Sequence, residues 1–280
     1  MESNQSKQPF RVAILDMYKG EPNQGMRNLR EILERFALEK NITLQKKIYD
    51  VRGKKELPGL DYDAYISTGG PGSPIEPEGW EDAYMALIHS IILHNENENN
   101  KKFVFLICHS FQVICHHFKL ATVCLRKKES FGIFPMHKTY QARNNVFTYK
   151  LKDVFYAVDS RKWQVIQPDY EALRFMGAKI LAIEKERPHI PHERATMMIQ
   201  FTPEIIGTQF HPEAGPKGMI FYLTGEEKKK IVIDNLGLEK YNNMLTQLYD
   251  PDKIKYTQKT LIPCFLEEAV KMSNINSAIL

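Results

Sequence analysis

The segment LICHSFQ (residues 106–112) places a cysteine, Cys108, where an apolar run gives way to a potential helix. At a helix N-terminus, the dipole and the free backbone N–H groups favour the thiolate, which is the nucleophilic form of cysteine. In such an elbow the N–H of the next residue, here His109, can bind an oxyanion. Taken alone, the motif fits equally well a small buried hydrophobic residue, which is the usual state of a free cysteine.

A second segment, IIGTQFHPEAG (residues 205–215), contains a possible base for this nucleophile. His211 and Glu213 follow an apolar, strand-like run. A cysteine nucleophile needs a base, and the base needs a third polar group to orient it. Because side chains two residues apart in an extended segment share a face, Glu213 can hold the imidazole of His211. The alternative is a histidine and a glutamate exposed in a surface turn.

A third segment, STGGPGSP (residues 67–74), is rich in glycine. Glycine permits backbone conformations that other residues avoid, and it can therefore direct an N–H group into a cleft. A tight turn after a strand is the alternative interpretation.

Strands and helices alternate over the first half of the chain. Compact apolar runs are typical of buried parallel strands, and helical spacing of apolar residues predicts the helices between them. This alternation indicates an α/β fold with a mostly parallel central sheet flanked by helices. Since ligands bind at the carboxyl ends of such strands, we expect Cys108 and the glycine segment to share one cleft. The predicted strands are residues 10–16, 42–51, 63–68 and 103–107, and the predicted helices are residues 26–40, 80–100 and 110–120.

The second half of the chain is richer in predicted strands, and its last part is predicted to be helical. We divide the sequence into a polar N-terminal tail, an α/β domain and a helical C-terminal extension that would pack on the domain or form an oligomer surface. The strand-like runs are residues 146–158, 163–167, 178–184, 196–201 and 205–210, and the three predicted parts are residues 1–9, 10–215 and 216–280.

Composition excludes several classes of function. With 280 residues and 43% hydrophobic residues, the chain can bury a sizeable core. Its net charge of +4 is small and the basic residues are scattered, so no nucleic-acid partner is expected. No apolar segment approaches the ~20 residues of a membrane span. Because the four cysteines form no CxxC pair, we expect a reducing, cytoplasmic setting.

No metal and no cofactor are expected either. The candidate ligands are histidine pairs that no cysteine or carboxylate cluster accompanies at a ligand spacing. These pairs are His116 with His117, and His189 with His192.

Taken together and in this order, the three segments resemble the signatures of the class I glutamine amidotransferase family: an SGGP-type loop, a GxCxGxQ elbow and a late HPE. The resemblance runs from about residue 11 to about residue 215. Two further stretches resemble the family, ESFGIFPM (residues 129–136), which would line a glutamine pocket, and DSRKWQVIQ with GAKILAIE, which would lead to the HPE strand. Among members, the chain resembles the amidotransferase domain of GMP synthase. The resemblance implies the flavodoxin-like fold of this family.

The resemblance also implies roles for individual residues. Cys108 would attack the side-chain amide of glutamine, His211 would act as general base and then acid, and Glu213 would orient His211. Backbone N–H groups would form the oxyanion hole, and other residues would bind the substrate. The residues implied are Gly70 and His109 for the oxyanion hole, and Gly72 and Gln112 for substrate binding.

Two positions depart from the family pattern. Glycines usually stand two residues before and two residues after the nucleophile, where this chain has Leu106 and Ser110. Serine is small enough for a close approach of strand and helix, whereas Leu106 is expected to reshape the elbow. These departures leave open a catalytically silent relative that acts as a binding or regulatory subunit.

The substrate and the partner stay open at this point. Residues beyond 215 contain no nucleotide-binding glycine loop, so ammonia would have to pass to a separate synthase subunit. A stand-alone γ-glutamyl hydrolase acting on γ-glutamyl amines or peptides is the other enzyme reading. A homo-oligomer is possible in either case.

Overall fold

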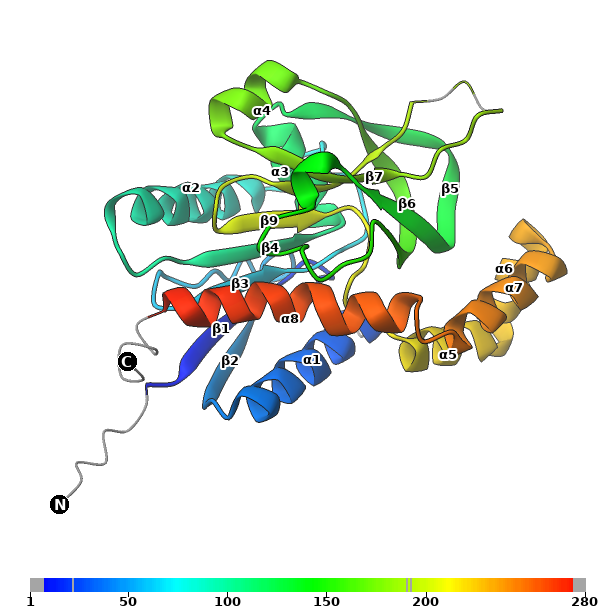
Figure 1. Cartoon of the computed structure of the whole chain (residues 1–280), viewed down its shortest axis with the longest axis horizontal. Coiled ribbons are helices and arrows are strands. Elements are labelled where there is room, and N and C mark those ends of the chain that lie inside the picture. Colours follow the sequence, from blue (N-terminus) through cyan, green and yellow to red (C-terminus); the bar gives the residue numbers. More distant parts are fainter. Residues whose placement is uncertain (1–7, 22, 190, 192, 274–280) are drawn as a thin grey trace.

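The computed structural model describes residues 8–21, 23–189, 191 and 193–273. Within them the chain forms a mixed nine-stranded sheet in the order β2-β1-β3-β4-β9-β8-β7-β5-β6 (Figure 1). Neighbouring strands are parallel from β2 to β9 and antiparallel from β9 to β6. The strands are β1 (Phe10–Asp16), β2 (Leu44–Asp50), β3 (Ala64–Ser67), β4 (Phe103–Ile107), β5 (Ala121–Lys138), β6 (Val154–Pro168), β7 (Lys179–Glu184), β8 (Thr196–Gln200) and β9 (Ile205–Thr208).

Helices cover both faces of the parallel part of the sheet. On one face α1 and α8 contribute fully buried side chains such as Leu33 and Phe265, and on the other α2 and α3 contribute Ile91 and Phe111. The two faces arise because successive strand residues point to opposite sides. The helices are α1 (Gln24–Lys40), α2 (Glu81–Asn97), α3 (His109–His117), α4 (Tyr170–Met176), α5 (Pro216–Thr224), α6 (Glu226–Leu236), α7 (Leu238–Tyr249) and α8 (Ile254–Met272), with a 3-10 turn at Tyr140–Ala142.

Local sequence sets the limits of α1. The side chain of Asn23 accepts a hydrogen bond from the N–H of Met26 and so caps the first turn. Asn41 ends the helix with a φ of 52°, in the left-handed region that asparagine tolerates. The buried residues between them lie at helical spacing, as the sequence predicts.

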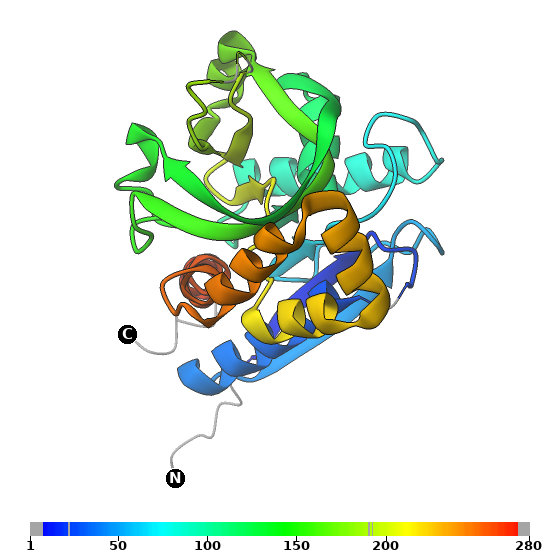
Figure 2. The ribbon, with the colours of Figure 1, turned by 90° about the vertical axis from the view of Figure 1, so that its right-hand side faces the viewer.

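The long antiparallel strands β5 and β6 form a curved ribbon beside the parallel part of the sheet. Figure 2 shows this ribbon curling away from the sheet, with α5, α6 and α7 next to it. Ile133 and Val158 of the ribbon pack with Leu223, Val232 and Met244 of these helices in a separate hydrophobic cluster. The ribbon and these helices therefore share a core of their own, apart from the two cores on the faces of the sheet.

The structure confirms the predicted α/β fold and corrects two predicted strands. Residues 146–152 form turns rather than a strand, because the backbone of Asn145 accepts from the N–H of Thr148 at 3.0 Å and its side chain accepts from the N–H of Phe147, also at 3.0 Å. Residues 154–168 form one continuous strand, although charged residues interrupt its apolar pattern. The sequence also missed β5, whose central residues are polar.

The segment after residue 215 is helical, as predicted, but α8 does not stand apart from the domain. Leu261, Phe265 and Ala269 of α8 are fully buried in the core that includes α1 and β1. The division at residue 215 stays a prediction, and the proposed tail at residues 1–7 and the last residues, 274–280, lie outside the described residues. Among the helices described, none has the length and apolar character needed to span a membrane.

Candidate active site

The β4 strand ends at Ile107 and α3 begins at His109, so Cys108 forms the sharp turn between them. Its backbone has φ 49° and ψ −95°, a strained conformation for a residue that has a side chain. Two hydrogen bonds hold it there: the N–H of Cys108 donates to Thr208 O at 2.7 Å, and Cys108 O accepts from the N–H of Gln112 at 3.0 Å. The sequence therefore produces an elbow that turns the thiol away from the strand direction.

His211 and Glu213 follow β9, the strand next to β4. The imidazole lies beside Cys108, since one Cβ atom placed on Gly69 would come within 2.9 Å of His211 Cε1 and 3.5 Å of Cys108 Cβ, and its Nδ1 lies 2.8 Å from Glu213 Oε1. The N–H of His211 donates to Val158 O of β6 at 2.8 Å, and Gln258 of α8 donates to Glu213 O at 2.9 Å. Backbone contacts from both sides thus fix the positions of the base and of the carboxylate that orients it.

Two neighbours, Glu213 and Cys108, determine the pKa of His211. Burial by itself lowers the pKa of His211, but the Glu213 carboxylate and the neighbouring Cys108 outweigh it and hold this pKa well above its usual value. The raised pKa favours the protonated imidazole. A cationic imidazole beside a cysteine is the environment in which a thiolate forms.

Tyr18 covers this pair, and nothing in its sequence context indicated it. Burial raises the pKa of Tyr18 well above its usual value, and Glu213 and Cys108 add to the shift. A Cβ atom placed on Gly25 would lie 3.3 Å from both the Tyr18 hydroxyl and Glu213 Oε1. A neutral hydroxyl thus lies near the carboxylate, whose Oε2 is buried without a hydrogen-bond partner among the described residues.

The glycine loop after β3 comes directly against the catalytic candidates. A Cβ atom on Gly69 would lie 2.9 Å from His211 Cε1 and 3.5 Å from Cys108 Cβ. A Cβ atom on Gly70 would instead clash with the backbone oxygen of Met17. Gly69 is therefore the glycine that makes room for the imidazole, and the expected role of the Gly70 N–H group in the oxyanion hole stays a prediction.

Arg52 holds this loop in place, and the sequence gave no signal for it. Its guanidinium donates to Met17 O at 3.2 Å and to Pro71 O, and its Nη2 pairs with Glu78 Oε1 at 2.6 Å. Burial raises the pKa of Glu78, but hydrogen bonds from Arg52 and Lys19 outweigh it and lower that pKa to about 2. Gly72, with a φ of 95°, is exposed next to this guanidinium.

The side chain of His109 plays no acid–base part. Its ring is buried, and burial together with the nearby Arg52 charge lowers the pKa of His109 to about 3. The imidazole is therefore neutral over the physiological range. What His109 offers to the site is its backbone N–H, one of the first in α3, which have no partner within the helix.

Gln112 lies behind Cys108 and makes contacts within the protein. Its Nε2 donates to Gln209 Oε1 at 3.2 Å and to Trp163 O at 3.4 Å, and only 3% of the residue is exposed. Gln209 in turn places its Nε2 3.8 Å from Cys108 Sγ. Sequence reasoning missed Gln209, which lies between the nucleophile and the residue expected to bind substrate.

Metal-binding candidates do not come together. Across the part of the chain that is described, no three His, Cys, Asp or Glu side chains are grouped so that they could hold a metal ion. His117 lies 3.1 Å from His89 between their Nε2 atoms, without a third ligand of these types. His192 lies outside the described residues.

A nucleophile elbow, a paired base and a close glycine loop are what a cysteine-dependent amidase requires. Comparison with family profiles gives a match over residues 13–221 to "Glutamine amidotransferase class-I". The chain belongs to this family. The family predicted from the sequence is thereby confirmed. No curated protein sequence matches the chain.

Solved structures share the fold of this class-I glutamine amidotransferase. A glutamine amidotransferase from Thermotoga maritima is 18% identical, the alignment covers 94% of this chain and 99% of that one, and the TM-score is 0.62. A glutamine amido transferase from Methylobacillus flagellatus is 14% identical, with 96% of each chain covered and a TM-score of 0.64. The glutaminase domain of Trypanosoma brucei CTPS with bound acivicin is 16% identical, with 72% and 86% covered and a TM-score of 0.53.

The structure accommodates both departures from the family's elbow pattern. Leu106 is fully buried on the α2 and α3 side of the sheet, and Gly207 stands opposite it on β9. A Cβ atom on Gly207 would lie 3.2 Å from Leu106 Cβ and 2.8 Å from Phe111 Cδ2, so the neighbouring strand provides the room that leucine takes. The hydroxyl of Ser110 donates to Thr68 O and ties the elbow to the strand that carries the glycine loop.

Proposed function

We propose that this class-I glutamine amidotransferase hydrolyses the side-chain amide of glutamine through Cys108, His211 and Glu213. The observation that carries the proposal is the elbow conformation of Cys108, whose thiol meets an imidazole that is held at 2.8 Å by a buried carboxylate. A nucleophile, a base and a group that orients the base are the parts required for acyl transfer.

In this reaction the Cys108 sulfur attacks the amide carbon, and a negative charge develops on the amide oxygen. The backbone N–H groups of His109 and Gly70 would stabilise that charge, each such donor contributing about 3 kcal/mol. His211 then donates its proton to the departing nitrogen, so that the C–N bond breaks and ammonia leaves. Water, deprotonated by His211, hydrolyses the thioester to glutamate and returns Cys108 to the free thiol.

In the first candidate function, the ammonia released from glutamine passes to a separate synthase subunit. A second candidate is hydrolysis of γ-glutamyl amines or peptides by the same three residues.

Ammonia release from glutamine tests the proposal. We expect the native chain to release ammonia, and Cys108→Ala and His211→Ala to lose at least 100-fold in kcat. An electrophilic diazoketone analogue of glutamine should label the native chain at Cys108, with mass spectrometry locating the adduct, and should leave Cys108→Ser unmodified.

Cys115→Ser is the matched control, since Cys115 is a fully buried thiol on the same helix. It should keep both the labelling and the activity. Absence of labelling and of turnover, under conditions in which a known amidotransferase reacts, would indicate a silent binding subunit instead.

A further inference from the structure

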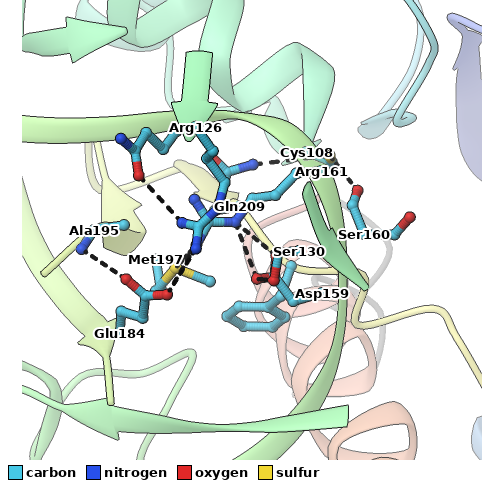
Figure 3. Close-up of polar contacts among 12 residues, drawn as sticks. Cys108, Arg126, Ser130, Asp159, Ser160, Arg161, Glu184, Ala195, Met197 and Gln209 are labelled. Carbon is cyan, nitrogen blue, oxygen red and sulfur yellow. Dashed lines mark hydrogen bonds and ion pairs between the residues drawn. The ribbon is translucent and has the colours of Figure 1, made fainter. Parts of the chain in front are cut away.

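Two polar groups from other elements lie beside the Cys108 sulfur. The thiol lies 3.8 Å from Ser160 O of β6, and Gln209 Nε2 lies 3.8 Å from the same sulfur (Figure 3). A carbonyl oxygen can only accept a hydrogen bond, whereas an amide NH2 group can only donate one. The sulfur therefore lies between an acceptor on β6 and a donor that follows β9.

Gln209 and its neighbour Gln112 form a buried chain of amides that ends at the sulfur. Gln112 Nε2 donates to Trp163 O at 3.4 Å and to Gln209 Oε1 at 3.2 Å. Gln209 is fully buried and only 3% of Gln112 is exposed, so both amides are shielded from bulk water. Buried polar groups that satisfy one another in this way are held in a single arrangement.

This chain of amides determines which end of Gln209 faces Cys108. Because Trp163 O is a backbone acceptor, the end of Gln112 that faces it must be the NH2 group. The same NH2 group faces Gln209, whose nearer atom must then be the acceptor Oε1. The other end of Gln209, its NH2 group, therefore faces the sulfur. Reversing either amide, or both, would bring two acceptors or two donors together.

The two contacts respond in opposite ways when the thiol loses its proton. A neutral thiol can donate its hydrogen to Ser160 O, but a thiolate has no hydrogen and can only accept. The Gln209 N–H group then becomes a charge-assisted donor, and such hydrogen bonds are shorter and about twice as strong as neutral ones. Gln209 therefore favours the form of Cys108 that acts as a nucleophile.

We propose that Gln209 is a further catalytic residue that donates a hydrogen bond to the Cys108 thiolate, and that Gln112 is a positioning residue that orients the Gln209 amide. This inference rests on the proposed role of Cys108 as nucleophile. The thiol proton passes to His211, the S–C bond to the substrate's amide carbon then forms, and Gln209 keeps all of its own hydrogens.

Titratable groups on the surrounding elements also act on the sulfur or on its contacts. Gln209 carries no charge, so replacing it with another uncharged residue leaves the charges of these groups in place. A change in the titration of Cys108 would then report the lost hydrogen bond. The groups are His211 and Glu213 after β9, Tyr18 after β1, His109 at the start of α3, and Asp159 and Arg161, which flank Ser160 on β6.

Alkylation of the full chain by iodoacetamide at a series of pH values tests the proposal, because the thiolate is the reacting form. The reagent is not a glutamine analogue, and peptide mass spectrometry follows Cys108 separately from the other cysteines. We expect Gln209→Met to raise the apparent pKa of this reaction by about one unit, the size expected for one lost hydrogen bond to a charged group.

Steady-state kinetics with glutamine separates this role from a purely structural one. In Gln209→Met, kcat/KM should fall about tenfold on the acid side of the pH profile, as a shift of one unit requires, and should recover at alkaline pH. A structural role would lower kcat/KM at every pH. Circular dichroism checks that the variant is folded.

Gln112→Met is a second variant that keeps the donor but removes the residue that orients it. It should raise the apparent pKa of Cys108 alkylation by less than Gln209→Met does. In the Gln209→Met background it should add no further shift, because the two residues act through the same hydrogen bond.

Gln164→Met is the matched control, since Gln164 Nε2 lies 3.7 Å from the sulfur of a different cysteine, Cys124. It should leave the alkylation profile of Cys108 unchanged. The native profile at Cys108 in both Gln209→Met and Gln112→Met would refute this inference, while glutamine hydrolysis by the native chain would leave the proposed function standing. Absence of glutamine turnover and of diazoketone labelling in the native chain would refute the proposed function instead.

Discussion

At the scale of single residues, Gly69 determines whether His211 can face Cys108. A Cβ atom there would lie 2.9 Å from His211 Cε1, which is closer than real Cβ contacts come. Because the obstacle is a side chain, Gly69→Ala should displace the imidazole and leave the sheet intact. A displacement of about 1 Å in an active site can cost about 100-fold in rate, and we expect that loss in kcat for glutamine.

Steady-state kinetics and urea unfolding of the same samples check this expectation. Gly225→Ala is the control, since a Cβ atom there would meet its nearest neighbour at an ordinary 3.7 Å. An unchanged kcat in Gly69→Ala would contradict the assignment of His211, and a large loss of stability would mean that the loop, not the imidazole, had moved.

The interaction of Glu213 with His211 should make the free energy of unfolding depend on pH. Once Cys108→Ala has removed the thiol, Glu213 is the main group that raises the pKa of His211. A raised pKa in the folded state stabilises the fold below the unfolded pKa of about 6.5, and that contribution is lost as the pH rises through the folded value. Glu213→Gln in this background should therefore be less stable than its parent at pH 6, with a gap that narrows at alkaline pH.

Urea unfolding across the pH range measures that gap, and NMR titration of His211 measures the pKa directly. Glu239→Gln, at an exposed residue of α7, should show no pH-dependent difference. A His211 pKa that does not fall in Glu213→Gln would rule out the carboxylate as the cause.

Sequence reasoning found the residues that belong to short motifs and missed those that arrive from elsewhere in the chain. Cys108, His211 and Glu213 were predicted from their local patterns, and the structure places His211 against Glu213 and close to Cys108. Arg52 and Gln209 reach the site through contacts that only the folded chain creates. The roles assigned to all these residues stay predictions until the kinetic experiments are done.

At the scale of elements, the β4–β9 strand pair makes room for Leu106 in place of the family's usual glycine. Gly207 stands opposite Leu106, and a Cβ atom there would come within 2.8 Å of Phe111 and 3.0 Å of Phe201. These rings are fixed in a packed core, where overpacking costs about 1–3 kcal/mol. We therefore expect Gly207→Ala to lower the free energy of unfolding by about that amount.

Urea unfolding followed by circular dichroism tests this expectation, with Gly225→Ala again as the control. Because Phe111 lies on the elbow helix, the diazoketone should also label Cys108 more slowly in Gly207→Ala. If Gly207→Ala had the same free energy of unfolding as the native chain, β4 and β9 would be able to move apart without loss of stability.

Two charged residues within β6 are the reason why this strand could not be predicted as continuous from the sequence. Asp159 and Arg161 interrupt the apolar pattern, and such charges usually mark a loop. Here the two side chains pair with each other at 2.8 Å inside the protein, and Ser130 of β5 donates to the same carboxylate at 2.7 Å. The pairing partner on β5 allows a charged segment to remain a buried strand.

At the scale of the whole molecule, α8 joins the C-terminal segment to both the core and the site. Phe265 is fully buried and contacts Phe105 of β4 at a ring distance of 5.2 Å. Gln258, near the start of the same helix, donates to Glu213 O. The region beyond residue 215, expected to be an extension, therefore includes a helix that the α/β domain needs for its own core.

We expect Phe265→Ala to lower the free energy of unfolding by about 3–5 kcal/mol, because it removes a large side chain from the centre of the core. Phe175→Ala on α4 is the matched control: Phe175 is 96% exposed, and its loss should change stability by less than about 0.5 kcal/mol. Circular dichroism and tryptophan fluorescence should report one shared transition for both variants, as expected for one cooperative unit. If α8 were a separate extension, Phe265→Ala would instead melt it in an early transition that leaves tryptophan fluorescence unchanged, since Trp80 and Trp163 both pack in the other core, with α2 and α3.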